Sequence, residues 1–396
     1  MEAKTTKLKT GTYRAELLLD ANNNTLLPFN FDLSYENKKP RIIFRNAEEK
    51  IVVDEIRQYK DSIFIKLPVF DTEIRCKIKG GVWEGVWINH YRKDKNIIPF
   101  KAYFNQTYRF ETTSPVSTES VEGRWEVVFK GQNGKDTKAI GVFHHIEQSP
   151  FISGTFLTET GDYRYLEGVL NGKKLLLSCF DGSHAFLFEA TLSDKEHLEG
   201  VFYSGSHWKE NWSGIKNDSA RLRDPDKITY VKTKDSVFTF RYQDTKGNWV
   251  SSGDDSFKNK VIIVQLMGSW CPNCMDESRF LKQVHEKYNA LGLEIVALAF
   301  EKTNDPEKSK AQVERMKTRL ELPYPVLITQ KTGKDKAGET LPFLNEIAAF
   351  PTTLFLDRSH NIVKIHTGFS GPATGKAYAD FVKETEQLIE QLLEQR

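Results

Sequence analysis

The pattern of apolar residues changes once along this chain of 396 residues, close to residue 217. Before that point, short apolar runs such as YRAELLLD, DSIFIKLPVF and HAFLFEATL are separated by Gly, Asn and Asp, a pattern typical of strands joined by hairpin turns. No stretch of this part keeps a helical period for several turns. After that point, segments with the pattern of strands alternate with segments with the pattern of helices. The chain is therefore predicted to be multi-domain, with an N-terminal all-β region followed by an α/β domain.

The N-terminal region also resembles itself. KDSIFIKLPVFDTE matches NGKKLLLSCFDGS in a way that aligns Leu67 with Leu177, an offset of 110 residues (177 − 67). Two further pairs of segments keep a similar spacing. This period is long for a solenoid repeat and suits a small barrel or sandwich. We predict two tandem barrel- or sandwich-like units, at residues 8–112 and 113–217.

The remainder of the chain has a different organisation. Residues 218–227 are polar and without a period, as expected of a linker. In the domain predicted at 228–396, KVIIVQLMG reads as a strand buried on both faces, helical periods cover 277–292 and 304–320, and PTTLFLDRSHNIVKIHTG reads as a hairpin. An amphipathic helix in AYADFVKETEQLIEQLLEQR closes the chain. Strands and helices that alternate in this way predict a mixed, largely parallel sheet covered by helices.

Composition removes several classes of function. Lys and Arg number 56 and Asp and Glu 54, which leaves a net charge of +2 and gives no electrostatic reason to expect nucleic acid as a partner. No apolar run approaches the roughly 18–20 residues of a membrane span. The start MEAKTTKLKT lacks the apolar core of an export signal. A cytosolic protein and an exported protein whose signal has been removed would both begin in this way, so the compartment has to be inferred from other features. Four cysteines are too few for a disulfide framework.

The segment QLMGSWCPNCMDES carries the main chemical signal, a Cys-x-x-Cys pair formed by Cys271 and Cys274. The pair falls where the buried strand ends and a helix begins. Unpaired N–H groups and the dipole at a helix start stabilise a thiolate, which favours Cys271 as the attacking thiol. Cys274 lies one turn into the helix, where it is expected to be buried and close enough to form a disulfide. The pattern therefore predicts a redox-active dithiol with Cys274 as the resolving thiol.

Other readings of the pair fit less well. Zinc requires four ligands, and the other cysteines, Cys76 and Cys179, stand alone in predicted strands. A chance spacing does not account for the position at a helix start. A peroxidase with one attacking cysteine is disfavoured because the second cysteine is only three residues away. We therefore predict no metal and no cofactor beyond the cysteine pair. Cys76 and Cys179 are expected to be buried free thiols, with a bond between them left open.

The unit strand-WCPNC-helix, the segment AAFPTTLFLD and the later HTG resemble the thioredoxin-fold domain of TlpA/ResA-like thiol-disulfide oxidoreductases. The resemblance covers about residues 226–396. It implies a thioredoxin fold and a cis-proline loop, Phe350-Pro351-Thr352, that faces the cysteines and presents its backbone to an extended substrate segment. It also implies that Trp270 shields the thiol.

The same resemblance assigns roles to neighbouring residues. Gln265 stands where cytosolic thioredoxins keep a buried Asp. Glu277 occupies a position that in this family is credited with moving the proton of the resolving thiol, although a surface acid favoured by the helix dipole is an equal alternative. The match departs at Arg279, where related domains carry a proline, and at Pro272-Asn273, where Gly-Pro is common. The redox potential is therefore not transferable from the family.

The resemblance implies that the chain reduces disulfides in partner proteins, in the periplasm or elsewhere outside the cytoplasm. It also implies that a thiol-disulfide donor in the membrane then reduces the chain's own cysteine pair again. A membrane anchor is left open. In the alternative reading, the β region is an envelope-associated module that binds a glycan, lipid or protein, and the thioredoxin-like domain is secondary. An intermediate reading lets the β units position the substrate. Four tryptophans in this region would either line a groove or, as is more common, fill the core: Trp83, Trp87, Trp208 and Trp212.

Overall fold

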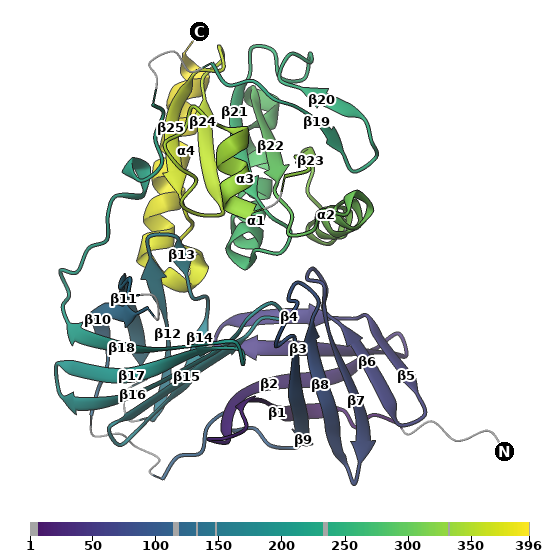
Figure 1. Cartoon of the computed structure of the whole chain (residues 1–396), viewed down its shortest axis with the longest axis vertical. Coiled ribbons are helices and arrows are strands. Elements are labelled where there is room, and N and C mark those ends of the chain that lie inside the picture. Colours follow the sequence, from purple (N-terminus) through teal and green to yellow (C-terminus); the bar gives the residue numbers. More distant parts are fainter. Residues whose placement is uncertain are drawn as a thin grey trace. The chain divides into compact units, whose positions relative to one another are not determined.

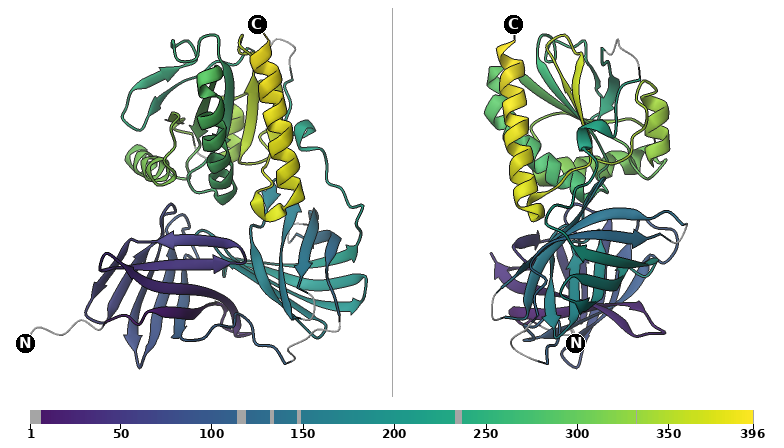
Figure 2. Two further views of the ribbon diagram at one scale, coloured as in Figure 1. Left: turned by 180° about the vertical axis from the view of Figure 1, so that it is seen from behind. Right: turned by 90° about the vertical axis from the view of Figure 1, so that its left-hand side faces the viewer.

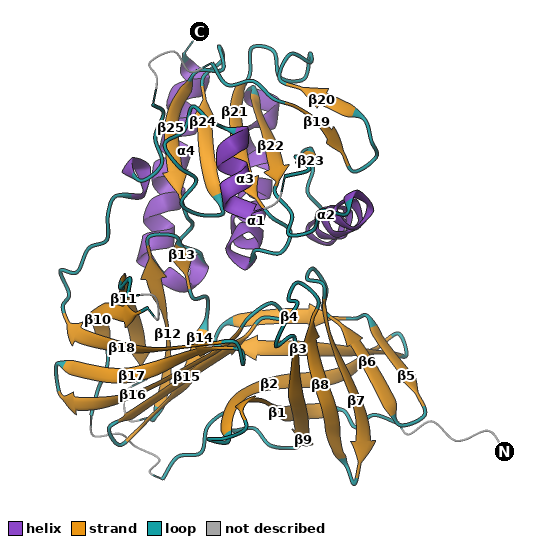
Figure 3. Ribbon diagram, viewed as in Figure 1, coloured by secondary structure: helices purple, strands orange, loops and turns teal. Residues whose placement is uncertain are grey.

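The computed structural model of the chain separates into two compact units (Figure 1). The first unit consists of Met1–Phe156 and Tyr163–Arg221, and the second of Leu157–Asp162 and Leu222–Arg396. Among the described residues, every helix lies in the second unit (Figure 3). The structure describes residues 7–113, 119–131, 134–146, 149–232, 237–331 and 333–395.

The first of two nine-stranded sheets follows the chain as an antiparallel meander. Its strand order is β4-β3-β2-β1-β9-β8-β7-β6-β5, so that the first and last strands pair in the middle. Along β1, buried residues alternate with partly exposed ones, as expected for a sheet with one face on the core. The strands are β1 (Gly11–Asp20), β2 (Thr25–Glu36), β3 (Lys39–Asn46), β4 (Glu49–Val53), β5 (Ile56–Tyr59), β6 (Ser62–Lys66), β7 (Thr72–Lys79), β8 (Val82–Asn89) and β9 (Ile97–Phe104).

The second nine-stranded sheet has the order β11-β10-β18-β17-β16-β15-β14-β12-β13. An additional pairing of β11 with β12 closes this sheet on itself, which makes it barrel-like. Its strands are β10 (Gly123–Lys130), β11 (Thr137–His145), β12 (Phe151–Thr158), β13 (Gly161–Asp162), β14 (Leu166–Asn171), β15 (Lys174–Phe180), β16 (Ala185–Asp194), β17 (His197–Ser204) and β18 (Trp208–Lys216).

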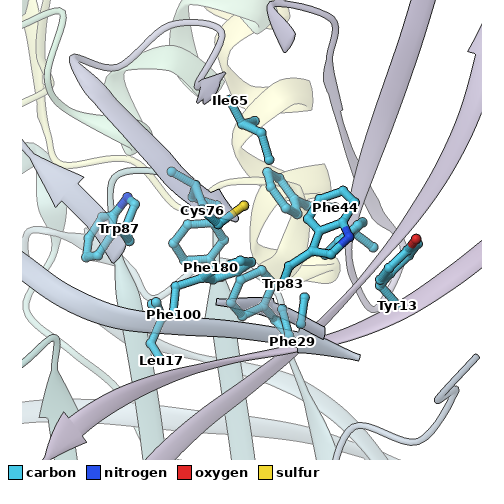
Figure 4. Packing of buried hydrophobic residues seen from close by; sticks show 14 of the residues in the cluster. Tyr13, Leu17, Phe29, Phe44, Ile65, Cys76, Trp83, Trp87, Phe100 and Phe180 are labelled. Atoms are coloured by element: carbon cyan, nitrogen blue, oxygen red, sulfur yellow. The ribbon is translucent and has the colours of Figure 1, made fainter. Parts of the chain in front are cut away.

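Aromatic residues dominate the two hydrophobic cores of the first unit. Phe180 on β15 packs into the core of the first sheet, where its ring stacks on Phe29 with centroids 4.3 Å apart (Figure 4). Trp83 and Trp87 lie in the same core and Trp212 in that of the second sheet. These three tryptophans therefore fill cores and do not line a groove.

The second unit is built around a seven-stranded sheet of order β20-β19-β23-β22-β21-β24-β25, with helices on both faces (Figure 2). No described helix is both long and apolar enough to cross a membrane. The strands and α-helices are β19 (Arg241–Asp244), β20 (Trp249–Ser251), β21 (Val261–Met267), α1 (Pro272–Tyr288), β22 (Leu293–Ala299), α2 (Pro306–Leu320), β23 (Val326–Ile328), α3 (Gly333–Thr340), β24 (Thr352–Leu356), β25 (Ile362–Thr367) and α4 (Lys376–Glu394).

The predicted fold class is confirmed, with an all-β region followed by an α/β domain. The expectation of a largely parallel sheet is wrong, because among the described strands of this sheet only β21/β22 and β22/β23 pair in parallel. β24 and β25 are joined by a short turn, and a short connection permits only antiparallel pairing. The internal repeat, the β units at 8–112 and 113–217, the linker at 218–227 and the domain at 228–396 stay predictions.

Candidate active site

The cysteine pair lies at the junction of β21 and α1. β21 is buried along its whole length, and Cys271 is the N-cap of α1, followed by Pro272 in the first turn. The Cys274 N–H donates a hydrogen bond to Cys271 Sγ at 3.3 Å, so one of the orphan N–H groups of the helix start points at the first sulfur. Cys271 is 6% exposed, whereas Cys274 is completely buried. A substrate can therefore meet only the first thiol of the pair.

The cis-proline loop lies directly against Cys271. The Phe350–Pro351 peptide bond is cis, and the Cys271 thiol donates to the Phe350 carbonyl at 3.5 Å. Thr352 begins β24, pairs with Leu266 of β21, and donates its hydroxyl to the Ala349 carbonyl at 2.8 Å. The pairing of β24 with β21 thus brings the loop and the thiol together.

Aromatic side chains and one lysine border the thiol on another side. Trp270 donates its indole N–H to the Phe300 carbonyl at 3.0 Å, and its ring meets that of Phe350 edge to face. Phe300 stacks on Phe350 with centroids 5.5 Å apart. The Lys302 ammonium lies 4.0 Å from the Trp270 ring centroid, a distance at which cation–π attraction is strong. Trp270 is therefore held in place by three contacts.

Behind the thiols lies a buried polar network centred on Glu277. One carboxylate oxygen accepts from the Gln265 amide at 2.8 Å, and the other accepts from the Thr353 hydroxyl at 2.7 Å. Gln265 also donates to the Cys274 carbonyl at 3.3 Å and accepts from the Ser278 hydroxyl at 3.0 Å. Glu277 is 1% exposed, so the alternative of a surface acid is wrong.

Burial governs the titration of both groups behind Cys271. It raises the pKa of Glu277 to about 7, against the opposing effect of the hydrogen bonds from Thr353 and Gln265. Burial, followed by the hydrogen bond to Cys271, raises the pKa of the Cys274 thiol well above its usual value. Cys274 is thus kept as a thiol, and the Glu277 carboxyl titrates near neutral pH.

A second buried acid, Glu301, holds the segment that leads to Cys271 and was not singled out by the sequence motifs. Glu301 accepts from the Ser269 N–H at 2.8 Å and from the Ser269 hydroxyl at 2.7 Å, and it is 2% exposed. Burial raises the pKa of its carboxyl. Its sequence signal is weak, namely an acid two residues after the end of a largely buried strand, β22. Thr353 was also missed from the sequence, because its partner Glu277 is far away in the chain.

The remaining predicted residues lie at the edge of the site. Asn273 donates its amide to the Asp162 carbonyl at 3.2 Å. Arg279 pairs with Asp276 at 2.7 Å on the surface of α1, which runs unbroken past it. Among the residues that the structure describes, no three metal-ligating side chains lie together. Cys76 and Cys179 are both free and buried.

A thiol pair at the start of a helix, facing a cis-proline loop on a mixed sheet with helices on both faces, defines a thiol-disulfide oxidoreductase of the thioredoxin fold. Residues 232–380 match the family model named Redoxin. The resemblance to TlpA/ResA-like proteins is confirmed for this domain.

Curated relatives and solved structures each match part of the chain. ResA from Bacillus thuringiensis subsp. konkukian is 25% identical over 145 residues, which cover 37% of this chain and 73% of the relative. ResA from Halalkalibacterium halodurans is 26% identical over 164 residues, which cover 41% and 77%. A crystal structure of a putative thiol:disulfide interchange protein DsbE from Chlorobium tepidum covers 41% of this chain and 99% of its own, with 20% identity and a TM-score of 0.33.

Proposed function

We propose that this chain reduces disulfides in partner proteins outside the cytoplasm. The observation that carries the proposal is the asymmetry of the thiol pair. Cys271 is reachable and lies at a helix start beside Pro351, whereas Cys274 is buried next to an acid that titrates near pH 7. The ResA relatives are named thiol-disulfide oxidoreductases, and the location outside the cytoplasm rests on this relationship.

The reaction proceeds in two exchanges. In the first, the Cys271 thiolate attacks one sulfur of the substrate disulfide; a Cys271–substrate bond forms, and the other substrate sulfur leaves and takes up a proton. In the second, Cys274 loses its proton and attacks Cys271 Sγ; the enzyme disulfide forms, and the remaining substrate sulfur leaves as a thiol. Two electrons pass to the substrate. A dithiol donor, which the resemblance places in the membrane, then has to return the enzyme to its reduced form.

Glu277 is the base for the second exchange. The Cys274 thiol is held protonated by burial, so its attack requires a nearby proton acceptor. Gln265 holds the Glu277 carboxylate next to the Cys274 backbone, since its amide donates both to the Cys274 carbonyl and to that carboxylate. Thr353 fixes the other carboxylate oxygen. The carboxylate is thereby positioned near Cys274, where it takes up the thiol proton during the second exchange.

Trapping of the intermediate tests the proposal. Cys274→Ser should accumulate a mixed disulfide with proteins of a periplasmic extract, because the second exchange is lost, and Cys271→Ser should trap none. Reducing and non-reducing gels distinguish the two. The proposal is wrong if neither variant, or both equally, forms such adducts.

A second candidate function belongs to the first unit, which contains a polar cavity of about 390 Å³. Tyr203, His207, Trp208 and Lys209 line it together with Lys95. Aromatic and hydrogen-bonding side chains of this kind suit a glycan. Under this reading, Trp208→Ala abolishes binding to an array of soluble glycans while Cys271→Ser binds normally. The absence of glycan binding by the unaltered chain would exclude it.

A further inference from the structure

A short hairpin that precedes the redox domain by about seventy residues in the sequence is part of the same compact unit. It consists of the end of β12 and of β13, where Leu157 pairs with Asp162 and Thr158 with Gly161. The Thr158 hydroxyl donates to the Gly161 carbonyl at 2.8 Å and accepts from the Thr160 N–H at 3.2 Å. The tip is therefore held in one conformation by its own hydrogen bonds.

Asp162 fastens this hairpin, Leu157–Asp162, to the thiol site. Its carbonyl accepts from the Asn273 amide at 3.2 Å, and its carboxylate accepts from the Gly371 N–H at 2.5 Å. Asn273 lies between the two cysteines of the motif, so one of these bonds is made inside the Cys-x-x-Cys segment. The side chain of Asn273 thus connects the motif to the hairpin.

A second attachment lies at the other end of the tip. The Glu159 carboxylate accepts two hydrogen bonds from the Arg223 guanidinium, at 2.7 and 2.5 Å. A two-bond arrangement of this kind fixes orientation as well as distance. Because Arg223 is well exposed, its role is to position the tip more than to stabilise the fold.

Two glycines allow the backbone of the hairpin to approach the site. A Cβ atom on Gly161 would lie 2.1 Å from the Asn273 amide nitrogen, and one on Gly368 would lie 2.9 Å from the Thr160 carbonyl carbon. Both glycines have positive φ angles, +141° and +79°. The Gly368 N–H also donates to the Pro351 carbonyl at 2.9 Å. Gly368 therefore touches the hairpin on one side and the cis-proline loop on the other.

We propose that the hairpin Leu157–Asp162 determines which disulfides reach Cys271. It occupies the space beside Asn273 and Gly368, so a substrate has to approach from the side of Trp270 and Phe350. Small disulfides and disulfides in extended, exposed segments fit such an approach. Disulfides enclosed by bulky folded structure on both sides are excluded. This inference rests on the proposed thiol-disulfide exchange and names the substrate class of that site.

The experiment compares two disulfides in single turnovers of the reduced full-length chain, with oxidised glutathione as the small substrate and insulin as the folded one. Replacement of Thr158–Gly161 by Asn-Gly shortens the hairpin by one residue pair and removes its contacts with Arg223 and Gly368. The ratio of the insulin rate constant to the glutathione rate constant should rise about tenfold. The same replacement of Asp194–His197, a hairpin of the first unit with an equally short turn, is the matched control and should leave the ratio unchanged.

A milder variant covers the case in which the shortened chain fails to fold. Arg223→Gln alters only an exposed side chain, and it should raise the same ratio about two- to threefold by releasing Glu159. The inference is overturned if glutathione oxidises the thiol pair normally but the ratio of the hairpin variants equals that of the control. If glutathione does not oxidise the pair in any form of the chain, the proposed function fails, which is a separate result.

Discussion

The two buried cysteines of the first unit and the two of the second unit differ in the expected reactivity of their thiols. Cys76 and Cys179 lie in strands of the first unit, and burial raises the pKa of Cys76 to about 12 and that of Cys179 well above its usual value. Their neighbouring backbone N–H groups belong to strands paired on both sides. Cys271 differs because the N–H of Cys274 points at its sulfur. Burial alone makes an inert thiol, whereas an N–H donor at a helix start favours the thiolate of Cys271.

The surroundings of the two pairs show the same contrast. Around Cys76 the core is a set of packed aromatic rings (Figure 4). Behind Cys274 the core is polar, with Gln265, Glu277 and Thr353 all buried. A buried carboxyl costs stability unless it is hydrogen-bonded, and Gln265 and Thr353 provide its hydrogen bonds. This polar cluster sets the surroundings of Cys274 apart from the aromatic surroundings of Cys76.

The largest expected effect separates the two cysteine pairs directly. Cys271→Ser should lower the rate of exchange with oxidised glutathione by about a thousandfold or more, because the attacking sulfur is lost. Cys179→Ala, in the first unit, should leave that rate within about twofold. Stopped-flow fluorescence measures both. An equal loss in the two variants would break the comparison.

The charged groups of the first unit should matter for stability and not for redox chemistry. Arg109 is buried, and it donates to the Ser178 carbonyl and to the Arg45 carbonyl and pairs with Glu167. Arg109→Ala removes these buried contacts and should lower the free energy of unfolding by about 3 kcal/mol. Urea denaturation checks the loss. The exchange rate with glutathione, measured on the folded fraction, should not change.

Removal of the buried base should slow the second exchange. Glu277→Gln keeps the shape of the side chain but cannot accept the Cys274 proton, so resolution of the mixed disulfide should slow about a hundredfold. In the unaltered chain this step should accelerate as the pH rises through about 7, where Glu277 ionises. Rapid-quench gels at pH 5.5 to 8.5 would show the rise. A rise of the same size in the Gln variant would contradict the role of Glu277.

Replacement of Glu277 should also change the stability of the fold, and here the variant gains while its rate of exchange falls. The pKa of Glu277 is raised from 4.5 to about 7 on folding, so the folded chain holds a proton that the unfolded chain has lost between these values. Stability therefore falls as the pH rises from about 4.5 to 7 and stays lower above that. Glu277→Gln should be roughly 3 kcal/mol more stable than the unaltered chain at pH 8 and about equal at pH 4. The same free energies of unfolding, measured for Glu301→Gln, provide the comparison with the other buried acid.

Local patterns in the sequence were sufficient for part of the site. A buried strand, a Cys-x-x-Cys pair and a helical period specify one junction, so Cys271, Cys274 and the first turn of α1 could be placed without a structure. The residue pairs that give the site its chemistry are distant in sequence. Thr353 lies 76 residues from Glu277, and Asp162 lies 111 residues from Asn273. Nothing in the neighbourhood of either residue marks its partner.

The direction of the strands was the other feature that could not be predicted from the sequence. Apolar runs identify buried strands but carry no sign of direction, which is set by the connections. The short turn between β24 and β25 and the antiparallel pairing of β19 with β23 make the sheet less parallel than alternation suggested. The hairpin Leu157–Asp162 was missed for a related reason, because its own sequence reads as an ordinary turn of the β region.

The most direct test is the redox equilibrium of the thiol pair in graded glutathione buffers, followed by the fluorescence of Trp270, which adjoins Cys271. A two-electron transition at about −270 mV or lower is expected for a reductant. It should vanish in Cys271→Ser and in Cys274→Ser and persist in Cys76→Ser. A transition at about −120 to −180 mV, as in oxidases and isomerases, or the absence of any transition would contradict the proposed reduction of partner disulfides.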